Sequence, residues 1–438
     1  MPNFDSRNLA ELAFNNTVDQ KVDHLFRIES GRMVSVLVKI FGSQHLELAE
    51  DVVQSTLIKA LETWKYKGIP DNPKAWLYRV AKNNTIDIIR KEKRNTSFDF
   101  SDPNGQLLLS EYSINPTMNA LWDENRIKDD FLGMMFACCN PKISSENQIT
   151  FILKILCGFS TKEVAKAFLT SEDIISKRIY RTKEYFRENN LKPNLDSVNI
   201  TENSIKSVAN AIYLIFNEGY SSTSSDAVIR KDLVSQALFL TRELLNNKKT
   251  ALPEINALMA LMCFHASRMD SRVSETGDLI RLKDQDRSLW NKDMIAIGRD
   301  FLIKSGSGNR ISFFHFEAFI AMEHCNASSY EETNWSNILN FYNQMLEIKD
   351  DPVISLNRSL VILQENGPKA ALKDIEHLSD NKQMQKYYLY HAALGEIHKQ
   401  LKDDENAYLH FSRAKSLTKS KNEQRFLQSQ MDLVNPKI

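Results

Sequence analysis

The chain has 438 residues, of which 56 are Lys or Arg and 56 are Asp or Glu, so its formal net charge is zero. This length accommodates about two to four domains. The balanced charge excludes a protein that binds nucleic acid through overall positive charge, so any such affinity must come from local clusters of basic residues.

The cysteines and the apolar segments limit the classes of protein to which the chain can belong. Five scattered cysteines, at positions 138, 139, 157, 263 and 325, are an odd number and show no CxxC spacing. Asn140 follows the adjacent pair and no His lies near it, which favours buried thiols over a disulfide framework or a metal site. The N-terminus is unlike a signal peptide, and no apolar run approaches membrane-spanning length. We expect a cytoplasmic protein with no cofactor, no bound metal and no membrane association.

A 3.6-residue apolar period recurs along the chain, while Gly and Pro are sparse and alternating strand patterns are hard to find. This pattern predicts an all-α fold. Residues 1–94 and 119–190 form two small helical modules, separated by a linker at 95–118 that is rich in Ser, Asn, Asp and Pro. A long helical region follows over 200–438.

Residues 65–94 carry nine Lys or Arg against three Asp or Glu. Within them, NPKAWLYRVAKNNTIDIIRKEKR predicts a helix that combines cations, asparagines and Trp76. Cations hold phosphates, amides read base edges and rings stack on bases, so this set suits single-stranded or distorted DNA. An amphipathic helix with a solvated basic face would have the same composition.

Residues 160–187, STKEVAKAFLTSEDIISKRIYRTKEYFR, predict a helix-turn-helix whose second helix is capped by Ser171. Helical spacing places an apolar stripe, Ile175, Ile179, Thr182 and Phe186, toward a core. The other stripe offers donors, cations and an aromatic ring to a major groove: Asp173, Ser176, Lys177, Tyr180, Arg181 and Glu184. An ordinary helical hairpin with a solvated basic face is the alternative.

One tetratricopeptide-like helix pair can be read near the C-terminus. In HAALGEIHKQLKDDENAYLHFSRAKSL, the pair Leu394-Gly395 is followed by Ala407, Phe411 and Ala414, at the spacing of the small and aromatic packing residues of such repeats. VISLNRSLVILQENGPKAALKDIEHL is a weaker copy. Because one repeat cannot bury its apolar face alone, a short solenoid is expected.

The order of these segments resembles the extracytoplasmic-function branch of bacterial RNA polymerase sigma factors. AEDVVQSTLIKALETW corresponds to the helix that docks on the polymerase clamp, the Asn-rich basic helix to the reader of the −10 element, and the helix-turn-helix to the reader of the −35 element. DDFLGMMFACCNP, FNEGYSS, GDLIRLKDQDRSLW and DPVISLNRSL resemble a group of these factors with a C-terminal tetratricopeptide-like extension. Two positions depart from the resemblance: Asn140 stands where His is common, and Leu169 stands at the turn where Gly is common.

The resemblance implies regions 2 and 4 of a sigma factor, which bind promoter DNA and the clamp and flap regions of core RNA polymerase. The clamp would contact Glu50, Asp51 and Gln54. The −10 strand would contact Trp76, Arg79, Lys82, Asn83, Asn84 and Arg90, and the −35 groove would contact Ser176, Lys177, Tyr180 and Arg181. Thr161 and Arg178 would contact phosphates or brace the fold. The C-terminal region would control activity in response to a protein or small-molecule signal.

Two other functions stay open at this stage. A helix-turn-helix regulator with a tetratricopeptide sensor would bind duplex operators, but it needs neither the clamp-type helix nor the Asn-rich helix. An enzyme in residues 200–320 would use the polar blocks there, which lack a nucleophile–base pairing or ligand spacing. These blocks better suit helix caps and ion pairs: Asn217, Glu218, Gly219, Tyr220, His265, Arg268, Asp278, Asp284, Gln285, Asp286, Arg287 and Trp290.

Overall fold

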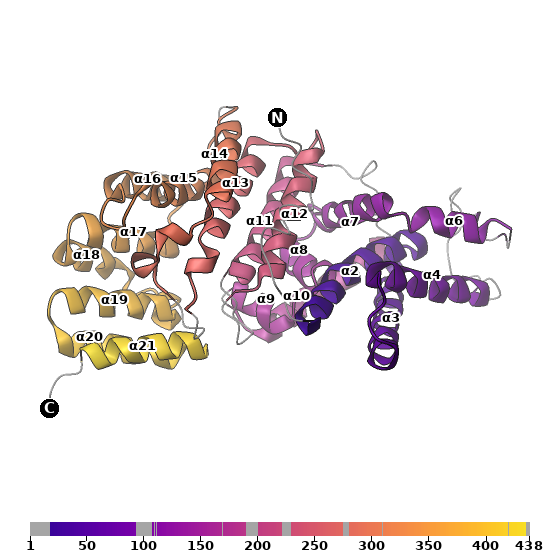
Figure 1. The fold of residues 1–438 in the computed structure, drawn as a ribbon, viewed down its shortest axis with the longest axis horizontal. Coiled ribbons are helices and arrows are strands. Elements are labelled where there is room, and N and C mark those ends of the chain that lie inside the picture. The colour runs from indigo at the N-terminus through magenta and orange to yellow at the C-terminus, as the bar shows by residue number, and fades with distance from the viewer. Residues whose placement is uncertain are drawn as a thin grey trace. The chain divides into compact units, whose positions relative to one another are not determined.

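The computed structural model describes residues 18–92, 107–108, 110, 112–168, 170–189, 200–220, 229–274, 280–308, 310–418 and 420–434. All elements assigned within these residues are helices, as the apolar period predicted. The helices divide into two compact units, one made of residues 1–218 and 231–237 and the other of residues 219–230 and 238–438 (Figure 1). None of the described helices is both long and apolar enough to cross a membrane.

The N-terminal unit begins with three helices and a 3-10 turn: α2 (Val18–Phe41), η1 (Ser43–His45), α3 (Leu46–Lys67) and α4 (Pro73–Glu92). Gly42 and Gly68 separate or end these helices at φ 87° and 77°, a conformation that glycine adopts without steric cost. Asn72 accepts a hydrogen bond from the amide of Ala75 at 3.0 Å, and Pro73 starts α4, where a missing N–H costs nothing.

The same unit continues through a second helical group: α6 (Ile114–Leu121), α7 (Glu124–Cys138), α8 (Ser145–Phe151), η2 (Ile152–Leu156), α9 (Thr161–Ala167) and α10 (Glu172–Asn189). The apolar segment ENQITFILKILCGF divides into α8 and η2, and η2 has the wider π-helical geometry. The backbone of α2 approaches this segment closely. A Cβ atom on Gly31 would lie 1.7 Å from the carbonyl oxygen of Leu156, so the backbones touch where the helix is widened.

Ion pairs reinforce this packing between the two helical groups of the unit. Lys39 of α2 binds Asp130 of α7, which is 2% exposed, and Arg27 of α2 lies 3.3 Å from Glu163 of α9. These ion pairs therefore tie together the two groups, which the sequence places on either side of the segment 95–118.

The chain passes between the units more than once. α11 (Glu202–Tyr220) falls in the N-terminal unit up to Glu218, residues 219–230 belong to the C-terminal unit, and the first seven residues of α12 (Lys231–Asn246) return to the N-terminal unit. The predicted domain limits of 1–94, 119–190 and 200–438 remain predictions. The boundary between the two compact units lies later in the chain than residue 200, where the C-terminal region was expected to begin.

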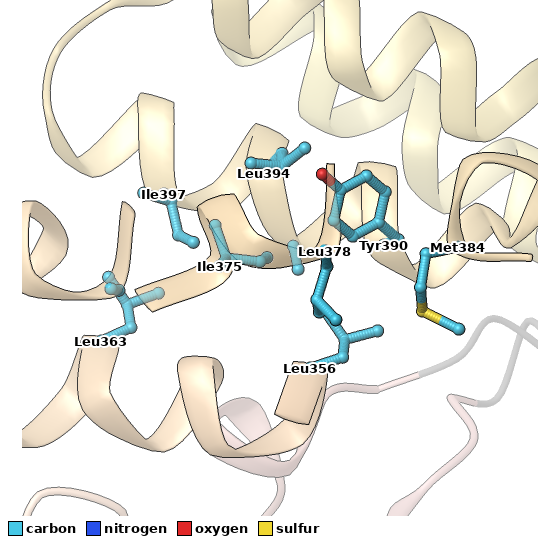
Figure 2. Close-up of a cluster of buried hydrophobic side chains, with 10 residues drawn as sticks. Leu356, Leu363, Ile375, Leu378, Met384, Tyr390, Leu394 and Ile397 are labelled. Atoms are coloured by element: carbon cyan, nitrogen blue, oxygen red, sulfur yellow. The ribbon is translucent and has the colours of Figure 1, made fainter. Parts of the chain in front are cut away.

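The C-terminal unit is a succession of helices in which neighbours along the chain pack together. Its α-helices after α12 are α13 (Pro253–Ser267), α14 (Lys292–Ser305), α15 (Phe313–Asn326), α16 (Trp335–Ile348), α17 (Pro352–Glu365), α18 (Pro368–Ile375), α19 (Tyr388–Gln400), α20 (Asp404–Leu417) and α21 (Lys421–Leu433). One buried cluster joins α17, α18 and α19, with Leu356, Ile375 and Ile397 at 3% exposure or less (Figure 2). Helices linked in this way build a core that no single pair could bury.

The residues chosen for the helix pair near the C-terminus do pack against one another. Ala407, Phe411 and Ala414 are at most 2% exposed, and a Cβ on Gly395 would lie 2.6 Å from the Phe411 ring. In the weaker copy, Gly367 at φ 86° separates α17 from α18. The helix pairing is confirmed; its tetratricopeptide character stays a prediction.

Candidate nucleic-acid interface

The outer face of α4 carries three of the six residues predicted to contact the −10 strand. Arg79, Asn83 and Arg90 are exposed, and at 100° per residue they fall within about 40° of one another around the helix. The opposite face is buried and includes Leu77, Ala81 and Ile89, each 0% exposed. This face presents cations and an amide together.

The other three predicted residues of α4 have contacts within the unit. Trp76 is half-buried and meets Trp64 edge-on, with ring centroids 5.5 Å apart. Lys82 donates to the Oδ1 of Asn119 at 2.7 Å, and Asn84 donates weakly to the hydroxyl of Thr56 at 3.5 Å. Lys82 and Asn84 lie on opposite flanks of the exposed face, so the six residues do not form a single surface.

The two faces of α10 separate as the sequence predicted. Ile175, Thr182 and Phe186 are at most 1% exposed, and Ile179 is half-buried. The four residues assigned to the −35 groove are all exposed: Ser176, Lys177, Tyr180 and Arg181. They occupy an arc of about 140° on the helix, which is wide enough to fill a groove.

Caps at the start of α9 and α10, and a cation–π contact between them, stabilise the helix pair. Ser160 and Glu163 form a reciprocal capping box at the start of α9, and the Ser171 hydroxyl accepts from the amide of Ile174 at 3.4 Å, the predicted cap. The Arg178 guanidinium lies 5.2 Å from the centroid of the Phe168 ring, so this residue braces the fold. Leu169, whose identity departs from the resemblance, lies outside the described residues.

The exposed stripe of α3 is longer than the sequence analysis predicted. Asp51 and Gln54 are exposed, while Glu50 is partly covered and pairs with Lys183 at 2.6 Å. Ile58 and Leu61, each 56% exposed, lie on the same stripe and were missed. Their signal was present in the sequence, since these two apolar residues are out of phase with the buried set Ala49, Val53, Ala60 and Trp64.

The polar blocks of residues 200–320 mainly cap and tie the helices of the C-terminal unit. Arg281 pairs with Asp284 at 2.8 Å, and Asp286 accepts from the amide of Ser288. Arg287 donates to the carbonyls of His324 and Ala327 at 2.6 and 2.7 Å. These contacts favour the interpretation as caps and ion pairs. Asp278 lies outside the described residues.

Burial shifts the pKa of several cysteine thiols and of His324. Burial raises the pKa of the Cys139, Cys157 and Cys263 thiols to about 12, so they stay protonated and unreactive at neutral pH. Burial lowers the pKa of His324 to about 3, with Arg268 and Arg287 adding to the effect. In the part of the chain that is described, no three His, Cys, Asp or Glu side chains are grouped so that they could hold a metal ion.

The C-terminal unit contains a partly open cavity of about 450 Å³. Aromatic side chains form much of its wall, including Tyr330, Trp335 and Phe426, and Arg281 and Glu396 add charge. A concave apolar site with a few polar groups is the usual form of a ligand pocket.

Comparison with known proteins identifies two parts of the chain. Residues 25–95, which hold most of α2 and all of α3 and α4, match the family Sigma-70 region 2. Residues 204–306 match a family of unknown function, DUF6596. An uncharacterized protein of Rhizobium meliloti is 33% identical over 390 residues, which cover 89% of this chain and 90% of that protein. No solved structure matches the chain.

Proposed function

The chain belongs to the same family as this Rhizobium meliloti protein and its region 2 gives it a sigma factor's role in transcription initiation; from this premise we propose that it reads both promoter elements, with α4 at −10 and α10 at −35. Region 2 implies binding to core RNA polymerase and promoter DNA and a transcription factor rather than an enzyme. We expect the protein to work in the cytoplasm, where the polymerase is.

The exposed face of α4 supports the −10 assignment. Arg79 and Arg90 can hold phosphates on either side of Asn83, whose amide can read the edge of an unpaired base. Trp76, at the edge of the same face, keeps part of its ring accessible for stacking.

The outer arc of α10 supports the −35 assignment, which goes beyond the part of the chain that matches a sigma family. Lys177 and Arg181 are one turn apart and exposed, so both can reach base edges or phosphates of a major groove. Tyr180, between them in the sequence, is 64% exposed, so its ring and hydroxyl are accessible to a partner.

The stripe of α3 supports docking on the polymerase clamp. Asp51 and Gln54 offer acceptors and a donor, and Ile58 and Leu61 provide the apolar centre that a stable interface needs. In the C-terminal unit, the cavity lined by Tyr330 and Trp335 supports a role in sensing a small-molecule or protein signal.

One observation carries the proposal: a region 2 match on α2, α3 and α4 is followed, in the same unit, by a capped helix pair with an outward basic face.

The test is in vitro transcription with purified core RNA polymerase and genomic DNA fragments. We expect promoter-specific transcripts from the wild-type chain. The double variant Lys177→Ala/Arg181→Ala should lower initiation about tenfold to a hundredfold at promoters that depend on a −35 element, because two groove contacts are lost. Lys162→Ala, at an exposed position of α9, serves as the matched control. Failure to bind core polymerase or to direct any specific transcript would refute the proposal.

A further inference from the structure

The cavity of the C-terminal unit has an aromatic wall. Trp335 meets two other rings of the lining edge-on, with centroids 5.4 Å from that of His324 and 4.9 Å from that of Tyr330. Phe426 adds a further ring, and leucine side chains of α17 and α19 complete the apolar lining. Because aromatic pairs attract one another beyond the area that they bury, this wall favours a ligand that itself contains an aromatic ring.

The size of the cavity suits a small molecule. Its volume of about 450 Å³ falls within the range of drug-sized ligand sites, roughly 300–1,000 Å³. Helices α15, α16, α17, α19, α20 and α21 all contribute side chains to the lining. A ligand held there therefore contacts most helices of this part of the unit at once.

Basic side chains outnumber acidic ones in the cavity lining, which contains Arg281, Lys283 and one carboxylate, Glu396. Arg281 pairs with Asp284 at 2.8 Å and approaches Glu396 at 3.9 Å. The exposed ammonium of Lys283, in contrast, forms no hydrogen bond or ion pair in the part of the chain that the structure describes. It is therefore available to an anionic group of a ligand.

Two further cations lie near the wall of the cavity. Burial and, to a lesser extent, the charges of Arg268 and Arg287 lower the pKa of His324, so both guanidinium groups lie close to this ring. Arg287 donates to backbone carbonyls, and Arg268 donates to the ring of His265 at 2.9 Å. Neither forms an ion pair with a carboxylate among the described residues. Their uncompensated charge adds to the attraction for an anion.

We propose that the cavity binds a small organic anion that carries an aromatic ring, with the ring against Trp335 and Tyr330 and the anionic group toward Lys283. This inference rests on the proposed role of the cavity in sensing and names the chemical class of the signal. A carboxylate, a sulfonate or a phosphate supplies the same chemistry, because each accepts charge-assisted hydrogen bonds from an ammonium group.

The first test compares two fluorescent dyes on the full-length protein. Anilinonaphthalene sulfonate and phenylnaphthylamine have the same rings, and only the sulfonate is charged. The uncharged dye is the more apolar, so burial alone favours it. We expect the sulfonate to bind at one site per chain and at least about tenfold more tightly than the uncharged dye. Equal or tighter binding of the uncharged dye would overturn the proposal.

Two pairs of variants locate the site. Lys283→Glu should weaken sulfonate binding about tenfold, because an attractive charge becomes repulsive. Lys292→Glu, at an exposed position outside the lining, should leave binding unchanged. Tyr330→Leu should weaken binding about threefold to tenfold, unlike Tyr408→Leu, 36% exposed and outside the lining. Since Lys283 is exposed, its change leaves the fold intact, and equal effects within the first pair would place the dye elsewhere and refute the site.

Competition identifies the anionic group that the site prefers. Naphthoate, naphthalene sulfonate and naphthyl phosphate share one ring system, and naphthamide is their uncharged counterpart. At least one of the anions should displace the dye about tenfold better than naphthamide does. If none of them does so, the recognition of an aromatic anion is wrong.

Transcription in vitro separates this inference from the proposed function. A chain that directs promoter-specific transcripts but shows no preference for the charged ligands would overturn the inference alone. A chain that binds the sulfonate at this site but directs no specific transcript would overturn the proposed function and leave the binding site in place.

Discussion

Three histidine rings stack between α19 and α20 in the C-terminal unit. The centroids of His391 and His398 lie 5.8 and 5.4 Å from that of His410, with the rings nearly parallel. Burial, and to a lesser extent repulsion from charge on the neighbouring His398 and His391, lowers the pKa of His410 to about 4. The stack is therefore stable only while its central ring is neutral.

This arrangement predicts loss of stability in mild acid. An unfolded histidine has a pKa near 6.5, so as the pH falls from about 6.5 toward about 4 the unfolded chain takes up a proton that folded His410 does not. The stabilisation is complete above the unfolded pKa and is lost through this window. Thermal unfolding at pH 7.5 and pH 5 should show a smaller drop in Tm for His410→Gln than for wild type. The exposed His377→Gln should behave like wild type, and equal drops in all three would contradict the prediction.

At the scale of elements, α3 has a buried face and an exposed face. Ala49, Val53 and Ala60 fix it to its own unit, while Ile58 and Leu61 face outward at 56% exposure each. Because the outward residues contribute little to the core, changing them should affect binding much more than folding.

The corresponding prediction concerns the affinity for core polymerase. Ile58→Ser/Leu61→Ser should weaken binding about tenfold, because two apolar anchors of the docking stripe are lost, with little change in the unfolding midpoint in urea. Ile303→Ser/Ile311→Ser removes two comparably exposed residues, 77% and 58%, from the C-terminal unit and should leave binding intact. Unchanged affinity of the α3 variant, measured by titration of labelled core polymerase, would exclude this stripe as the docking surface.

The elements also show what the sequence could predict. The apolar period identified the helices and both faces of α10, because a helix with one buried side repeats that side every 3.6 residues. It did not identify the π-helical η2 or the contact that Gly31, 125 positions earlier than Leu156, makes with it. Nor did it pair Glu50 with Lys183, because contacts between distant residues leave no local periodicity.

At the scale of the whole molecule, the division of the chain carries a prediction about α11. Ser207 of α11 makes a side-chain hydrogen bond with Cys139, a residue that is 7% exposed. A chain ending at residue 200 lacks this cover, whereas a chain ending at residue 237 keeps every residue assigned to the N-terminal unit.

Thiol labelling at pH 8 tests where the N-terminal unit is complete. Cys139 should react with a soluble disulfide reagent in the chain that ends at 200 and stay protected in the chain that ends at 237 and in the full-length protein. Cys138 and Cys157 are the internal controls, because both are buried among α7, η2 and their neighbours and should stay protected in all three. If Cys139 is equally protected in the shortest chain, the unit closes without α11.

Residues 231–237 belong to the N-terminal unit although residues 219–230 before them do not. This order affects when the N-terminal unit can fold during synthesis. Because residues 219–230 belong to the other unit, the N-terminal unit lacks its last residues until the ribosome has already made part of the C-terminal unit. Folding from the N-terminus is the usual order during translation. The N-terminal unit is therefore incomplete until residue 237 has been made, and a chain that terminates earlier lacks its last residues.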